Sequence, residues 1–247
     1  MTDKFELYDV LSVLVPGMLL VGLVPICFRS LLHIHGASFP AAFEVVLLTG
    51  LAVFLGFIVQ ALGSLIEPLL EKTWGGRPSK RAFAKGLGPR YLGKDEADRI
   101  KPKLVKAVGE GQSDGSLFRY ASQISDAAGI GRCTRFNGLY AYHRSLLAAA
   151  AASTGLFLVS TVSGSAAALS PSQKGLVFLG ALALIALLWH RTRQRSLYFA
   201  AEVLMTAERV LDEKTGASLK HAGDVAAEEP ASMRDVPAKA TETLKHS

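Results

Sequence analysis

The sequence has few charged residues and almost no cysteine. Only 19% of its 247 residues are Asp, Glu, Lys or Arg, and only 2 are Cys. The low charge excludes a disordered chain, which stays polar and charged because it cannot bury enough apolar surface. Two Cys exclude a disulfide scaffold, which carries many more in a shorter chain. Half of the residues are hydrophobic, and they gather in blocks with the charge between them, which favours a polytopic membrane protein with a basic soluble portion.

Four apolar blocks are long enough to be candidate membrane spans. A span needs about 20 mostly apolar residues, since a helix rises about 1.5 Å per residue across a hydrocarbon core of about 30 Å. The blocks cover approximately residues 11–28, 45–66, 146–169 and 175–189. The fourth is short, but Trp189 and His190 at its end suit the membrane interface. The sequence therefore predicts an all-α fold with four transmembrane helices.

The first block is expected to be a retained helix rather than a cleaved signal peptide. Its leader is acidic, and no convincing small-residue cleavage site follows the block. Pro16 and Gly17 fall inside it and predict a kink or a break in its hydrogen-bond ladder. Tyr8 and Asp9 stand just before it. We expect these four residues to shape the chain where it enters the membrane.

The distribution of basic residues predicts the orientation. Of 27 Lys and Arg, 15 lie between Glu71 and Arg144 and nine follow the fourth block. The loop between the first and second blocks and the loop between the third and fourth blocks hold one each. Because basic loops stay in the cytoplasm, both termini and the middle segment are expected to be cytoplasmic. Cys27 and Cys133 then lie apart, and no disulfide is expected between them.

The middle segment is predicted to be a small helical insertion between the second and third spans. Residues 94–108 and 117–127 have helical spacing of apolar side chains, and Ser113 provides a cap signal before the second stretch. A further helix is expected to begin near Arg135 and to continue into the third span. Asn137, Tyr140 and Arg144 then lie at its cytoplasmic base, where we expect them, with Arg135, to couple the segment to the span.

The region after the fourth span divides into a basic turn, an amphipathic helix and a polar tail. Arg191, Arg193 and Arg195 suit anionic headgroups. Residues 196–213 carry an apolar face that could meet another helix of the chain, a second subunit or the membrane surface. The sequence therefore predicts five regions. These are the first pair of spans (1–70), the basic helical segment (71–145), the second pair of spans (146–195), the amphipathic helix (196–213) and a disordered tail (214–247).

Polar residues near the spans give little sign of a metal or catalytic site. His33 and His35 are only two ligands where a site needs three or four, so we interpret them as polar loop residues. Glu44 and Glu67 bracket the second span, where both can reach water. Gln60 is the better candidate for a hydrogen bond between helices. Small residues along the third span suit either packing within one chain or oligomerisation.

The basic middle segment suits an anionic ligand, a nucleic acid or anionic lipid, but the positive-inside rule alone predicts its charge. It holds 15 basic and 7 acidic residues, a net charge of +8 against +6 for the whole chain. No phosphate-binding glycine loop, serine elbow, paired-cysteine or zinc-protease motif occurs in the sequence. We therefore expect no catalytic, cofactor-binding or metal-binding residues and favour a protein that is not an enzyme.

Two short blocks resemble a group of uncharacterised bacterial inner-membrane proteins. The first runs from Tyr8 to Gly17 as YDVLSVLVPG, and the second from Arg135 to Leu146 as RFNGLYAYHRSL. Neither block is a catalytic motif. Some similar proteins are encoded near mobile elements or phage-defence genes, so the resemblance implies a defence-effector role and transfers no functional residues.

The sequence thus predicts a non-enzymatic membrane effector or accessory component with a cytoplasmic sensing segment. We expect it to form a homo-oligomer or to bind another membrane or cytoplasmic protein. A small transporter or channel is the first alternative, but the first, second and fourth spans offer few polar residues for a path. A membrane enzyme acting on lipid is the second, and it would need Glu67, His143, Arg144 and His190 together at the cytoplasmic face.

Overall fold

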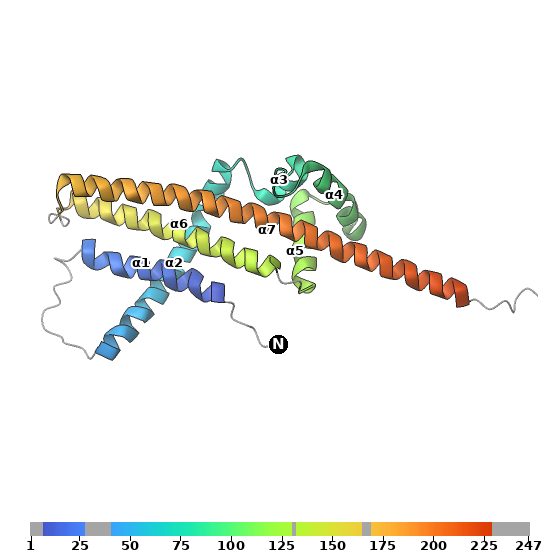
Figure 1. Ribbon diagram of the computed structural model, residues 1–247, viewed down its shortest axis with the longest axis horizontal. Coiled ribbons are helices and arrows are strands. Elements are labelled where there is room, and N and C mark those ends of the chain that lie inside the picture. Colours follow the sequence, from blue (N-terminus) through green and yellow to red (C-terminus); the bar gives the residue numbers. More distant parts are fainter. Residues whose placement is uncertain (1–6, 28–40, 130–131, 165–168, 229–247) are drawn as a thin grey trace, which may run out of the picture.

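The computed structural model describes residues 7–27, 41–129, 132–164 and 169–228, with side chains described for 10–23, 42–129, 132–164 and 169–215. These residues form helices and no strand (Figure 1). In chain order the helices are α1 Leu7–Cys27, α2 Ala41–Thr73, α3 Pro78–Lys85, α4 Lys94–Val108, α5 Asp114–Ala127, α6 Arg132–Val162 and α7 Pro171–Glu228.

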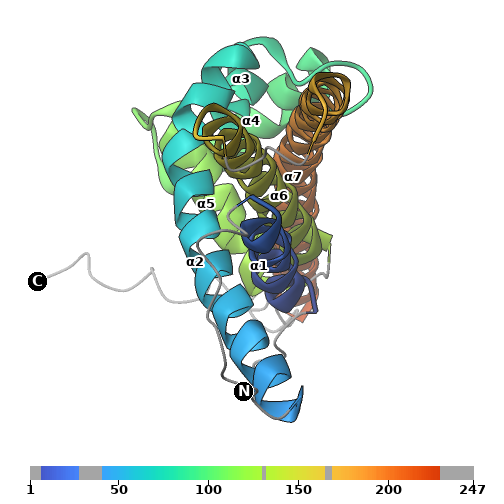
Figure 2. The ribbon, with the colours of Figure 1, turned by 90° about the vertical axis from the view of Figure 1, so that its left-hand side faces the viewer.

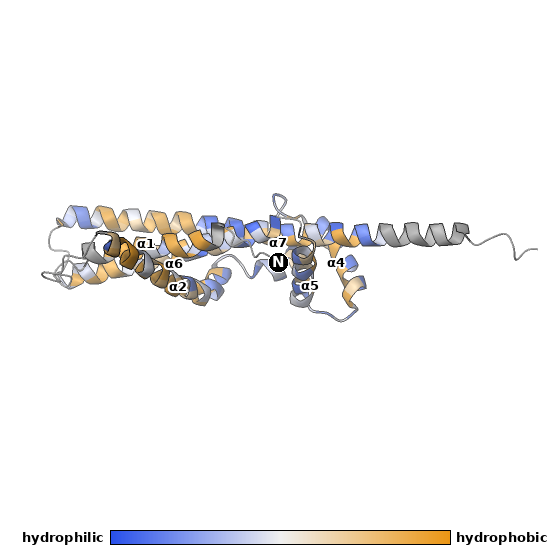
Figure 3. Cartoon of the chain, turned by 90° about the horizontal axis from the view of Figure 1, so that it is seen from below, coloured by the Kyte–Doolittle hydropathy of each residue, from blue (hydrophilic) through white to orange (hydrophobic). Residues whose placement is uncertain are grey.

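Three of these helices, α2, α6 and α7, are long and apolar enough to cross a membrane. In α1 the apolar stretch with described side chains, Val10–Leu23, is shorter. Large apolar side chains face outward along the first part of α7 and the first two thirds of α2; Leu176 and Val46, for example, are 72% and 69% exposed. Figure 3 shows these stretches as the hydrophobic end of the molecule. So many exposed apolar side chains suit a lipid environment and not water.

The long helices alternate in direction. The C-terminal end of α1, the N-terminal end of α2, the C-terminal end of α6 and the N-terminal end of α7 lie toward one end of the molecule (Figure 1). α6 and α7 run side by side as an antiparallel pair, and α2 crosses α1 and α6 obliquely (Figures 1 and 2). α3, α4 and α5 lie beyond the other end of the apolar region.

α1 and α2 pack with their backbones very close. A Cβ atom added to Gly17 would overlap the Ala52 carbonyl, and one added to Gly56 would overlap the Val13 carbonyl. Small residues at such crossings let helices in a membrane gain contact without clashing. α1 continues as one helix from Leu7 to Cys27 through Pro16, which is buried beside this crossing, and the kink expected at Pro16 stays a prediction.

The second half of α7 forms the centre of a small module with α3, α4 and α5, which we call the α3–α5 module. Its core includes Leu92, Ile100, Leu104, Leu117 and Leu204, all fully buried. Burying one such side chain contributes about 1.5–3 kcal/mol of hydrophobic free energy. The amphipathic stretch 196–213 therefore packs on helices of its own chain.

The helix boundaries correct two predictions. The amphipathic stretch is not a separate helix, because α7 continues through it from the fourth apolar block as one helix of 58 residues. No Gly or Pro between residues 181 and 215 would end that helix. The predicted tail from 214 also starts too early, since α7 reaches Glu228; residues 229–247 lie outside the described part. The helix at 94–108 and the Ser113 cap are confirmed, with Ser113 Oγ accepting the Ser116 N–H.

Candidate functional site

The most developed polar site joins α2 and α6 where the apolar region ends. Tyr140 donates its hydroxyl to Glu67 Oε1 at 2.8 Å, and Arg144 forms an ion pair with Glu67 Oε2. Arg144 also donates to Ser64 Oγ at 3.1 Å, and its guanidinium lies 5.5 Å from the centre of the Tyr140 ring. We call these four residues the Glu67 cluster. Its ionic side chains are mostly buried, with Arg144 14% and Glu67 25% exposed.

Helical spacing explains why the cluster forms. Ser64 and Glu67 are three residues apart on α2, and Tyr140 and Arg144 are four apart on α6, so each pair lies on one helical face. Gly63 lies beside the Arg144 side chain, since a Cβ added there would be 3.5 Å from Arg144 Cγ. Because a charge in a low-dielectric site costs free energy unless it is paired, the two partners hold α2 and α6 in one register.

Further polar contacts continue from this cluster to α7 and the α3–α5 module. Trp189 Nε1 donates to Thr73 Oγ1 at 2.9 Å and so ties α7 to the end of α2. Arg77 donates to Glu71 at 2.9 Å, and Arg81 donates to the Trp74 carbonyl at 3.1 Å. The short connection from α2 to α3 is therefore fixed by hydrogen bonds at both ends.

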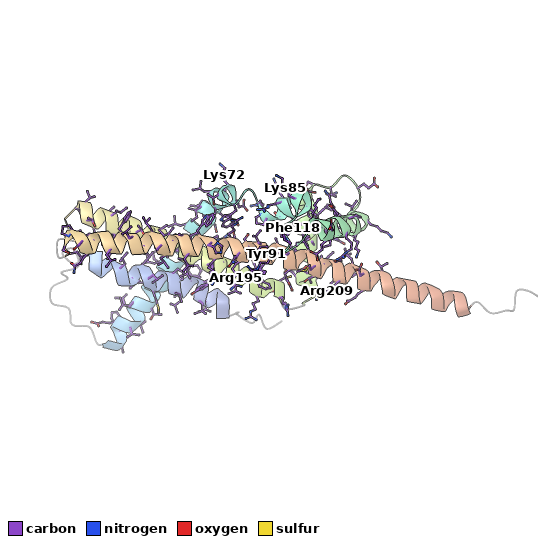
Figure 4. All side chains as sticks on the ribbon, turned by 45° about the horizontal axis from the view of Figure 1, so that its top comes forward. Lys72, Lys85, Tyr91, Phe118, Arg195 and Arg209 are labelled. Carbon is purple, nitrogen blue, oxygen red and sulfur yellow. The ribbon has the colours of Figure 1, made fainter. Side chains whose placement is uncertain are left out.

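A cleft of about 510 Å³ opens between this connection and the α3–α5 module. Glu67 and Tyr140 form part of its wall, so the Glu67 cluster reaches it directly. The cleft also presents cationic side chains and several serines. The lining residues of these two kinds are Arg77, Lys80, Arg119, Ser79, Ser113, Ser116, Ser122 and Ser196. Phe118, labelled in Figure 4, adds an aromatic surface from α5.

A second electrostatic contact joins α4 to the far half of α7. Arg99 donates to both carboxylate oxygens of Glu208, at 2.8 and 3.1 Å, and Lys103 bonds Glu208 and Asp212 at 2.8 Å each. The hydrogen bond from Arg99, and with it the one from Lys103, lowers the pKa of Glu208 below its ordinary value, although partial burial opposes this. This carboxylate therefore stays charged in the folded module well into the acidic range.

The structure places the predicted coupling residues in two different settings. Tyr140 and Arg144 belong to the Glu67 cluster. Arg135 and Asn137, earlier on α6, have exposed side chains and are not part of it. Glu67 was expected only to reach water at the interface; its spacing from Ser64 was visible in the sequence, but its partners lie more than 70 residues away.

The other predicted residues lie along α1 and α2. Pro16 and Gly17 are buried at the α1–α2 crossing. Tyr8 and Asp9 lie in the first turn of α1, and their side chains are outside the described part, as are His33 and His35. Gln60 is half-buried, and among the described residues its amide has no hydrogen-bond partner; its backbone carbonyl accepts the Ser64 hydroxyl.

The histidines do not complete a catalytic arrangement with the Glu67 cluster. His143 Nδ1 lies 2.7 Å from the Leu139 carbonyl, and its ring meets the edge of Tyr142. His190 is exposed on α7. Within the described residues no three His, Cys, Asp or Glu side chains group as metal ligands. Cys133 is a buried free thiol with Sγ 3.7 Å from Thr206 Oγ1. The contacts of the Glu67 cluster join α2 to α6, and Glu67 and Tyr140 face the cleft.

The chain gives no significant match to a protein-family model, to a curated protein or to a solved structure.

Proposed function

We propose that this chain is a non-enzymatic four-span protein of a bacterial inner membrane that passes the state of its cytoplasmic α3–α5 module to its membrane helices. The observation that carries the proposal is α7. One unbroken helix contains the apolar stretch that begins at Pro171 and also the buried face around Leu204 at the centre of the module. A shift of the module then moves a membrane helix, because residues 181–215 of α7 contain no Pro or Gly at which a helix commonly kinks.

The orientation rests on charge and on the direction of the helices. The basic segment and the termini are placed in the cytoplasm by the positive-inside rule, and α1 serves as the fourth span. The alternation of α1, α2, α6 and α7 fits two outward hairpins. The resemblance of the Tyr8–Gly17 and Arg135–Leu146 blocks to uncharacterised membrane proteins supports an effector or accessory role, with phage defence as one setting. Oligomerisation is part of this proposal.

The transporter alternative has less support from the membrane helices. The groove of about 450 Å³ between α1, α6 and α7 is lined almost entirely by apolar side chains. Its polar members are Ser153 and Thr154, and Thr154 donates to the Ala150 carbonyl within its own helix. The lipid-enzyme alternative keeps one observation in its favour, since Glu67 and Arg144 do meet, but neither His143 nor His190 joins them in the described structure.

Reconstitution in liposomes separates these functions. Purified protein is incorporated into vesicles of phosphatidylethanolamine and phosphatidylglycerol that hold a self-quenching dye, and dye release, flux of defined solutes and lipid turnover are followed together. We expect non-selective dye release from the native chain, because an effector whose membrane helices move disturbs the bilayer, and a several-fold change in release for Glu67→Gln, because it weakens the contact between α2 and α6. The exposed Lys85→Gln is the matched control. Solute-selective flux or lipid products without dye release would contradict the proposal.

A further inference from the structure

A small basic pocket lies on the side of the molecule where the α3–α5 module meets α6 and α7. Its volume is about 310 Å³. Arg191, Gln194, Arg195 and Tyr198 come from two successive turns of α7, Phe136 from the first turns of α6, and Arg90 from the connection between α3 and α4. Three parts of the chain that are distant in sequence thus converge on one site.

The charges in this pocket are not balanced by its own lining. Three of the six side chains are guanidinium groups, and the other three are an amide and two aromatic rings. Arg191 donates to the side-chain oxygen of Gln194, Oε1, at 3.4 Å, and no ion pair links Arg90 or Arg195 to a carboxylate among the described residues. Cations gathered in this way repel one another unless an anion lies between them. Guanidinium groups match the oxygens of a phosphate in particular.

The pocket follows the apolar stretch of α7 closely along that helix. Trp189, whose indole suits the membrane interface, comes two residues before Arg191 and six before Arg195 on the same helix. At about 1.5 Å per residue these arginines lie roughly 3 and 9 Å beyond the tryptophan along α7. The headgroup layer on each side of the hydrocarbon core is about 5–8 Å thick. Arg191 then lies within this layer and Arg195 just beyond it, where its long side chain can reach back to a lipid phosphate.

Aromatic rings hold the pocket in place. The rings of Phe136 and Tyr198 stack with centres 6.1 Å apart and 15° between planes, and Tyr91 meets Tyr198 edge-on at 4.8 Å. Tyr91 neighbours Arg90, so the packing of this ring fixes the chain beside one of the three guanidinium groups. Figure 4 labels Tyr91 and Arg195 in this region of the molecule.

We propose that this pocket binds the phosphate of an anionic phospholipid headgroup and thereby joins the α3–α5 module to the membrane end of α7. Arg90 binds the phosphate from the module, and Arg191 and Arg195 bind it from the helix. The proposal does not depend on the function proposed above. It requires only that α7 crosses a membrane, and it places a specific lipid at the joint between the two parts of the chain.

The test measures lipid binding by the full chain in detergent and in nanodiscs. Thermal unfolding is followed as phosphatidylglycerol, phosphatidylcholine or inorganic phosphate is added, and lipid retained on the protein is counted by native mass spectrometry. We expect phosphatidylglycerol to raise the melting temperature and to be retained, whereas phosphatidylcholine does neither. In Arg90→Gln and Arg195→Gln both effects should be lost.

Arg193→Gln is the matched control, because Arg193 lies on the same turns of α7 but its guanidinium sits 6.0 Å from the centre of the Trp189 ring and outside the pocket. It should keep the response to phosphatidylglycerol. An equal loss in Arg193→Gln would show general attraction to negative lipid and overturn the proposal, as would a full response in Arg90→Gln and Arg195→Gln. Inorganic phosphate that reproduced the whole shift would also overturn it, since the source would then be a free anion. The number of lipids retained on the protein measures binding directly, so it tests the proposal even if a variant loses stability.

Discussion

The two halves of α7 have the same backbone and opposite surroundings. In the first half, Leu176 and Leu179 are 72% and 64% exposed, and none of the most apolar stretch is buried within the chain. In the second half, Val203, Leu204 and Ala207 are fully buried against the α3–α5 module. The first half depends on a bilayer to cover it, and the second is covered by its own chain. One helix therefore connects a part stabilised by lipid to a part stabilised by a packed core.

Leu204→Ala should have the largest effect, because it opens a cavity in the core of the module. We expect a loss of about 3 kcal/mol in the free energy of unfolding, as for other buried Leu→Ala changes. Leu179→Ala, on the exposed half of the same helix, should change it by less than about 0.5 kcal/mol. Denaturant unfolding of the detergent-solubilised protein measures both. Similar losses for the two variants would mean that the halves of α7 do not differ in this way.

Gly56→Ala shows where the membrane part also depends on contacts within the chain. The added methyl group would overlap the Val13 carbonyl of α1, and such overpacking typically costs about 1–3 kcal/mol. Gly50→Ala, on the same helix, meets no atom within 4 Å and should leave stability unchanged or slightly higher. Melting temperatures of the two variants in one detergent give the comparison. An unaffected Gly56→Ala would show that α1 and α2 are not in close contact.

Removing one partner of the Glu67 cluster should weaken the contact between α2 and α6, which lies where the apolar region ends. Arg144→Gln leaves the Glu67 carboxylate mostly buried without its cation, and we expect a loss of about 2 kcal/mol. Arg77→Gln removes the more exposed pair with Glu71, where Arg77 is 56% exposed, and should cost less than about 1 kcal/mol. In a double-mutant cycle, Glu67→Gln with Arg144→Gln should cost less than the sum of the single changes. Simple additivity would show that the two side chains do not interact.

Local signals in the sequence were enough to predict α4 and α5, although not α3. α4 has the predicted bounds, and the hydroxyl of Ser113 caps α5, because capping residues and apolar spacing act over only a few positions. The continuity of α7 was missed because the basic turn at Arg191 to Arg195 was interpreted as a boundary. Charge marks the membrane surface and does not break a helix, whereas Gly and Pro, the residues that most often end one, are absent between residues 181 and 215.

The Glu67 cluster and the basic pocket could not be predicted in this way. Each brings together side chains from segments separated by 70 residues or more, such as Glu67 with Arg144 and Arg90 with Arg195. One sequence shows that these residues are charged and near the interface, but not which of them meet. That depends on how α6 packs between α2 and α7, which is a property of the whole fold.

The pH dependence of the module should be the smallest effect. The lowered pKa of Glu208 means that its ion pairs stabilise the folded module fully above the unfolded Glu pKa of about 4.3, and that this stabilisation is lost as the pH falls through the lower folded value. The contribution should be under about 1 kcal/mol, because Arg99 is 61% exposed and Lys103 is 31% exposed, so that solvent screens both ion pairs. Glu208→Gln should therefore flatten the fall in melting temperature between about pH 5 and pH 3, while Glu213→Gln, exposed on the same helix, should follow the native curve. If Glu208→Gln kept the native pH profile, the contact between α4 and α7 would contribute nothing through this carboxylate, and the second half of α7 would be held by its apolar face and by other contacts, such as the hydrogen bond from the Ser125 hydroxyl to the Val203 carbonyl.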